Sequence, residues 1–106
     1  MDKKDNSVQT AQAYQQMMIK LMNTAEQMYD EGQFKQAIQY YDQVLTQRDN
    51  LSKADLTYML YMRGSTQKEL GNLEQARQDF LEAQRLGFEH PLGVDLIAEA
   101  LASIGI

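Results

Sequence analysis

The stretch of sequence that decides the fold reads Gly71-Asn72-Leu73-Glu74-Gln75-Ala76-Arg77-Gln78-Asp79-Phe80-Leu81-Glu82-Ala83. A stretch of matching size and residue type begins 39 residues earlier, at Gly32. The aligned pairs are Leu21 and Leu60, Ala25 and Gly64, Gly32 and Gly71, Phe34 and Leu73, Ala37 and Ala76, Tyr41 and Phe80, and Val44 and Ala83. This internal repeat predicts two copies of one structural unit that pack side by side.

Apolar residues recur at steps of three and four along most of the chain, which is the spacing of one helix face. Single glycines and one proline divide this pattern into five predicted helices, which cover about 8–31, 34–48, 52–70, 72–86 and 91–103. Ser52 and Asn72 are expected to cap the third and fourth helices, and Pro91 suits the first turn of the fifth. Residues 1–6 are expected to form a frayed tail. No strand pattern competes, so we expect an all-α fold.

The composition argues against several classes of function. The chain has 106 residues, 43% hydrophobic and 24% charged, as in a single folded domain. Its formal net charge of -5 opposes binding to nucleic acid. There is no Cys, and a single histidine, His90, makes a metal site difficult to assemble. His90 has no adjacent Ser or Cys that could act as a nucleophile, and the sequence has no Gly-rich loop that could bind phosphate. We expect no enzymatic activity, no metal and no cofactor.

The beginning of the chain bears on its location. Residues 1–6 run into a Gln-rich stretch that has no continuous apolar segment. This pattern indicates neither a signal peptide nor a membrane span. We therefore expect a cytoplasmic protein that does not bind membranes.

The repeated pattern Gly-x-(Phe/Leu)-x-x-Ala-x-x-x-(Tyr/Phe)-x-x-(Val/Ala) resembles the second half of the tetratricopeptide repeat. The resemblance implies a right-handed superhelical stack of antiparallel helix hairpins in a single domain, residues 1–106. Repeat 1 would cover about 18–51, repeat 2 about 57–90, and 91–106 would form half a repeat or a capping helix. The chain departs from the family in three ways: its repeats are 39 residues apart instead of about 34, it has no Trp, and Arg63 and Gln67 replace apolar residues. A helical bundle without true repeats is the alternative.

The resemblance also implies a function, because the first helices of successive hairpins in this family line a concave groove that binds a segment of another protein. The family's groove positions fall here on Ile19, Met22, Glu26, Tyr29, Tyr58, Tyr61, Ser65 and Lys68, with Leu92, Asp95 and Glu99 following from the fifth helix. We therefore expect a protein-interaction module or scaffold that binds a peptide or helix, one that is apolar with some positive charge. A core position is the alternative for each apolar residue in this set.

The sequence also bears on other partners and functions. One subclass of the family captures acidic chaperone tails with basic residues and Asn, and Met22, Glu26, Tyr61 and Ser65 in those places argue against it. Small size and acidity also resemble the helical-repeat chaperones of bacterial type III secretion, which hold an apolar partner in the same groove. A structural protein that assembles with itself is the third possibility.

The fifth predicted helix is more apolar than a capping helix normally is. Its polar residues form one narrow stripe, and the rest of its surface would expose the self-association candidates Val94, Ile97, Leu101 and Ile104. We expect either a two-fold homodimer through this helix or a chain that is a fragment of a longer repeat protein.

Overall fold

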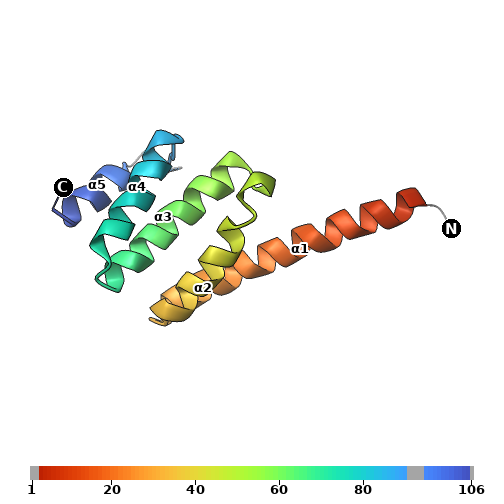
Figure 1. The fold of residues 1–106 in the computed structure, drawn as a ribbon, viewed down its shortest axis with the longest axis horizontal. Coiled ribbons are helices and arrows are strands. Elements are labelled where there is room, and N and C mark those ends of the chain that lie inside the picture. The colour runs from red at the N-terminus through yellow and green to blue at the C-terminus, as the bar shows by residue number, and fades with distance from the viewer. Residues whose placement is uncertain (1–2, 91–94, 106) are drawn as a thin grey trace.

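The computed structural model describes residues 3–90 and 95–105, and within these ranges the chain is helical with no strand. The helices are α1 (Lys3–Asp30), α2 (Phe34–Leu45), the short 3₁₀ helix η1 (Arg48–Asn50), α3 (Lys53–Glu69), α4 (Leu73–Arg85) and α5 (Leu96–Ser103) (Figure 1). The all-α fold predicted from the apolar periodicity is confirmed.

The helices form an elongated stack. Each α-helix packs against the next one along the chain, and α1 also contacts α3. The hairpins α1–α2 and α3–α4 therefore lie side by side, and α5 packs on α4 (Figure 1). Because α1 is much longer than α2, its N-terminal part projects beyond the other helices (Figure 1). The molecule, with this projection included, measures 59 × 27 × 23 Å.

Both hairpin turns are built in the same way, 39 residues apart. Gly32 and Gly71 adopt φ values of +76° and +81°, a left-handed conformation that residues with a Cβ rarely adopt. After each glycine, the next backbone N–H donates to a carbonyl five residues back, from Gln33 to Met28 at 2.8 Å and from Asn72 to Gln67 at 2.9 Å. This is the Schellman pattern that ends a helix and reverses the chain. The sequence repeat is thus visible in the backbone.

The core repeats the same equivalences. Tyr41 and Phe80 are fully buried at matching places of the two hairpins. The small partners Ala37 and Ala76 are also fully buried, which lets α2 and α4 lie close to the preceding helices. Burial of an aromatic ring of this size stabilises the fold by about 1.5–3 kcal/mol. Repetition of one packing unit therefore explains why the chain folds as two similar hairpins.

Arg63, which departs from the family pattern, has a structural explanation. Its guanidinium donates two hydrogen bonds to the carboxylate of Asp79, at 2.9 and 2.8 Å, and a third to Asp42 at 3.0 Å. Arg63 on α3 therefore connects α2 to α4. The other departure, Gln67, accepts a hydrogen bond from the Asn72 side chain at 2.8 Å. Polar contacts between helices replace the expected apolar packing at both positions.

Several predicted boundaries were wrong. The first helix begins at Lys3 instead of about residue 8, so the expected tail is helical over its described part. The second ends at Leu45, and its expected last residues belong to a turn and to η1. Ser52 caps α3 as predicted, because its Oγ accepts from the Asp55 N–H at 3.1 Å. Asn72 stands at the start of α4, but its side chain makes no capping bond to that helix.

The fifth helix is shorter than predicted. It begins at Leu96, and its cap is Asp95, whose side chain accepts a hydrogen bond from the Ala98 N–H at 3.0 Å. The proposed first-turn residue, Pro91, lies outside the described residues. A side-chain cap satisfies a free N–H of the first turn, which stabilises a helix start by about 1 kcal/mol. Asp95, which was predicted to follow as a groove position within the fifth helix, is therefore the residue that caps the start of α5.

Candidate functional site

The eight residues predicted to line a groove lie together on the side of the stack formed by α1, α3 and α5. Glu26 on α1 bonds to Tyr58 on α3, and the other residues line three pockets on the same side. Ile19 is 53% exposed, and the remaining seven are half-buried. We call this surface, from Ile19 and Met22 to Tyr29 and Lys68, the groove.

One pocket of the groove, here the acidic pocket, draws on three helices. It has a volume of about 320 Å³ and contains Tyr29 of α1, Tyr61, Ser65, Lys68 and Glu69 of α3, Phe80 of α4, and Leu96, Glu99, Ala100 and Ser103 of α5. Four of the eight predicted groove residues meet here, together with Glu99. The stacking of α1, α3 and α5 thus brings together residues that are as much as 74 positions apart, from Tyr29 to Ser103.

A hydrogen bond crosses the groove between α1 and α3. The Tyr58 hydroxyl donates to Glu26 Oε1 at 3.1 Å. Burial, followed by the nearby negative charge of Glu26, raises the pKa of Tyr58 to about 12. Both effects disfavour the phenolate, so Tyr58 stays protonated and remains a hydrogen-bond donor.

Tyr41 lies behind this pair, in the core. Its side chain is fully buried, and its hydroxyl has no hydrogen-bond partner among the described residues. Burial, and then the charge of Glu26, raises the pKa of Tyr41. Burial, and then the charge of Glu69, also raises the pKa of Tyr29 in the acidic pocket. Burial is thus the main cause at all three tyrosines, and a nearby carboxylate adds to the effect at each hydroxyl.

A second pocket, here the methionine pocket, lies between α1 and the start of α3. It has a volume of about 380 Å³ and is lined by Ala11, Tyr14, Gln15, Met18, Ile19, Met22, Asn50, Leu51 and Asp55. Tyr14 anchors α1 to the connection after α2, because its hydroxyl donates to Gln47 at 2.7 Å. Sequence reasoning found Ile19 and Met22 but not the pocket, since its other wall is the irregular segment around η1.

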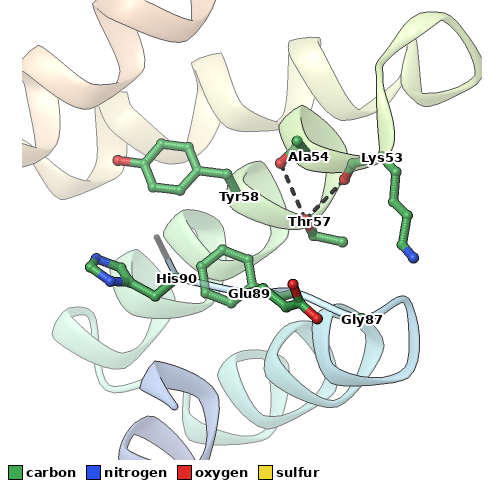
Figure 2. Close-up of a pocket in the computed structure, with 8 residues that line it drawn as sticks. Lys53, Ala54, Thr57, Tyr58, Gly87, Glu89 and His90 are labelled. Carbon is green, nitrogen blue, oxygen red and sulfur yellow. Dashed lines mark hydrogen bonds between the residues drawn. The ribbon is translucent and has the colours of Figure 1, made fainter. Parts of the chain in front are cut away.

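A third pocket, with a greater volume than the other two, was not predicted. It measures about 760 Å³ and is lined by Lys53, Ala54, Thr57 and Tyr58 of α3 and by Gly87, Phe88, Glu89 and His90 after α4. Figure 2 shows Tyr58 and His90 toward one side of it and Lys53 toward the other. Phe88 stacks on Tyr61 with ring centroids 5.2 Å apart. The sequence feature that could have indicated this pocket is Phe88, an apolar residue that directly follows Gly87, where α4 has ended.

The residues expected to mediate self-association are placed differently. Ile97 and Leu101 are only 2% and 9% exposed, because they pack into the core of the same chain. Ile104 is half-buried against that core, and Val94 lies outside the described residues. The exposed side of α5 carries Ala98, Glu99, Ala102 and Ser103, which are small or polar. The expectation that α5 exposes an apolar row is therefore wrong for Ile97 and Leu101.

The described residues contain neither a metal-binding cluster nor a membrane-spanning helix. Within residues 3–90 and 95–105, no cluster of three or more His, Asp and Glu side chains is arranged to hold a metal ion. Over the same ranges, no helix combines the length and the apolar character needed to cross a lipid bilayer.

The geometry defines the class of protein: a stack of antiparallel helix hairpins whose turns and core repeat every 39 residues. Comparison with known families then identifies the repeat. Residues 57–86, which contain most of α3 and all of α4, match the tetratricopeptide repeat family, so the chain carries a tetratricopeptide repeat. The resemblance seen in the sequence is confirmed. No curated protein and no solved structure matches the chain significantly.

Tetratricopeptide repeats generally serve protein–protein interaction and typically have no enzymatic activity. The match covers the second predicted repeat. The boundaries of the first repeat, about 18–51, and of the terminal half-repeat stay predictions, as does the binding role of the eight groove residues.

Proposed function

We propose that the chain is a protein-interaction module that binds a peptide or a helix of a partner protein in the groove. The observation that carries this proposal is the row of large, half-exposed side chains Met22, Tyr29, Tyr58 and Tyr61 on adjacent helices, next to open pockets. Tyrosine and methionine offer large contact areas with adaptable shape, and aromatic residues dominate binding energy at protein interfaces.

The test starts from a displayed library of random peptides selected on the protein. We expect binders whose affinity falls by a factor of about 30 or more, equivalent to about 2 kcal/mol, when Tyr58 and Tyr61 are both replaced by Ala. Tyr40→Ala is the matched control, because Tyr40 is a half-buried tyrosine on α2, outside the groove. Circular dichroism must show that all variants keep their helicity. Unchanged affinity in the double variant would reject the groove.

The secretion-chaperone alternative places an apolar partner in the same groove, so it differs only in the kind of partner. Coexpression distinguishes the two: a chaperone would co-purify with one small protein that is unstable alone, and an adaptor would bring down larger assemblies. Self-assembly through α5 has less support, because Ile97 and Leu101 are buried within the chain. A cytoplasmic location belongs to this proposal and is tested by cell fractionation.

A further inference from the structure

Positive charge is distributed unevenly between the two sides of the stack. All four arginines pair with carboxylates of α2 and α4: the pairs are Arg48 with Glu82, Arg63 with Asp42 and Asp79, Arg77 with Glu74, and Arg85 with Glu82. The helices α2 and α4 are the second members of the two hairpins and do not carry the groove residues. The carboxylates of this layer are therefore largely compensated within the chain.

The groove has no such compensation. Glu26 of α1, Glu69 of α3 and Glu99 of α5 lie along it, and Lys68 is the one basic residue that lines the acidic pocket. None of these four side chains forms an ion pair within the described part of the chain. Because the chain as a whole carries a net charge of -5, no distant excess of positive charge offsets them. The groove therefore attracts cations.

The polar groups at the centre of the groove also have unused hydrogen-bonding capacity. The carboxylate of Glu26 can accept about four hydrogen bonds, and within the described ranges it receives one, from Tyr58 at 3.1 Å. The fully buried Tyr41 hydroxyl behind it has no partner among the described residues, and Glu26 is its strongest charged neighbour. A buried hydroxyl without a hydrogen-bond partner destabilises the folded chain. Hydrogen-bond donors supplied by a ligand, such as an ammonium or a guanidinium group, match the free acceptors of Glu26.

The methionine pocket supplies an apolar anchor point at a known separation. Met22 in that pocket and Tyr29 in the acidic pocket are seven positions apart on α1. At the helical rise, this separation corresponds to about 10 Å along the groove. A partner can span that distance with about seven residues of helix or about three residues of extended chain.

We propose that the groove selects a segment of a partner protein that places an apolar side chain in the methionine pocket and a Lys or Arg side chain about 6–10 Å away, against Glu26, Glu69 and Glu99. The shorter distance is that from Met22 to Glu26 on α1, and the longer one is that from Met22 to Tyr29 in the acidic pocket. This inference rests on the proposed function and adds the chemistry of the partner. The Lys or Arg side chain donates to the carboxylates, and the apolar side chain is removed from water against Met18, Ile19 and Met22.

The experiment uses the full chain and peptides taken from the displayed library. Binders that depend on Tyr58 and Tyr61 are sequenced, and we expect them to be enriched in Lys or Arg near an apolar residue. One such peptide is then synthesised with its basic residue and with Glu in the same place. We expect the Glu version to bind about tenfold or more weakly, and we expect the affinity of the basic version to fall with added salt.

Variants of the protein locate the effect. Glu26→Gln combined with Glu69→Gln should lower the affinity for the basic peptide about threefold or more. The same variant should reduce the salt dependence of that affinity and should bind the Glu version of the peptide more tightly than the original protein does. Gln keeps the shape of Glu, and its carbonyl oxygen can still accept from Tyr58. Glu74→Gln is the control outside the groove: it removes one negative charge from an exposed position of α4, and it should leave both affinities unchanged.

Each outcome has a distinct meaning. If groove-dependent peptides are neutral or acidic, or if the charge variants bind the basic peptide as tightly as the original protein, the charge inference is overturned and the proposed function stands. If no peptide depends on Tyr58 and Tyr61, the proposed function fails and the inference fails with it. If light scattering finds a dimer that the Tyr58→Ala, Tyr61→Ala variant abolishes, a second copy occupies the groove, which also overturns the inference.

Discussion

Arg63 and Asp79 form a two-point ion pair between α3 and α4, with N–O distances of 2.9 and 2.8 Å. Asp79 is nearly buried, with 8% of its side chain exposed, and Asp42 of α2 adds a third hydrogen bond at 3.0 Å. The three residues together therefore connect α2, the second helix of the first hairpin, to α3 and α4, the two helices of the second hairpin. Burial of two charges is unfavourable unless both are well paired, so the arrangement depends on both members.

Removal of one member should be costly, and removal of both should be tolerated. We expect Arg63→Met to lower the free energy of unfolding by about 3 kcal/mol, because the Asp79 carboxylate is left buried without its partner. The double variant Arg63→Met, Asp79→Leu should recover most of this loss, since two apolar residues can pack in the same space. Urea unfolding monitored by circular dichroism measures both values. Equal destabilisation in the two variants would contradict this interpretation.

Gly64 should not tolerate a methyl group. A Cβ at this position would lie 2.7 Å from the Phe80 ring, whereas the equivalent residue of the first hairpin is a fully buried Ala25. Alanine favours a helix by about 1 kcal/mol over glycine, so the steric effect must exceed that gain. We expect Gly64→Ala to destabilise the protein by about 1–3 kcal/mol. Thermal unfolding tests this, and a stabilised variant would show that α3 and α4 separate easily.

The stability of the protein should fall at alkaline pH. The pKa of Tyr58 is about 12 in the folded chain against an ordinary value of 10.0, so the folded state holds this proton more tightly than the unfolded state. The resulting stabilisation is fully present below pH 10 and is lost as the pH rises toward 12. Tyr58→Phe should reduce this loss without abolishing it, because burial also raises the pKa values of Tyr29 and Tyr41. Unfolding curves measured across this pH range give the free energy of unfolding at each pH, and phenolate absorbance gives a second readout. If the free energy falls with pH equally in the original protein and in Tyr58→Phe, Tyr58 does not contribute to the loss.

The protein should not dimerise through α5. Ile97 is 2% exposed and belongs to the core of its own chain, so Ile97→Asp should unfold the C-terminal part of the stack instead of dissociating a dimer. Light scattering of the original protein at micromolar concentration should give the monomer mass. A dimer that Ile97→Asp converts to a folded monomer would contradict the burial seen in the structure. Ala98→Asp, on the exposed side of the same helix, is the control.

Much of the candidate site was predicted from the sequence, because the resemblance to the tetratricopeptide repeat implies which positions line a groove and the 39-residue offset aligns α1 with α3. That offset pairs Ile19 with Tyr58, Met22 with Tyr61, Glu26 with Ser65 and Tyr29 with Lys68, and the structure brings all of them to one side of the stack. The pockets were not foreseen. Their other walls are the segments around η1 and around Phe88, whose conformations have no periodic signal.

The sequence by itself determined the helices, the turns at Gly32 and Gly71, and the repeat that relates them. These features depend on residues a few positions apart, whose spacing can be read directly. Only the tertiary structure decided that Arg63 faces Asp79, that Ile97 is buried and that the Tyr41 hydroxyl lacks a partner. Each of these depends on which distant helix packs against which face. Local propensity specifies a helix, and only the packing of all helices specifies the surroundings of its side chains.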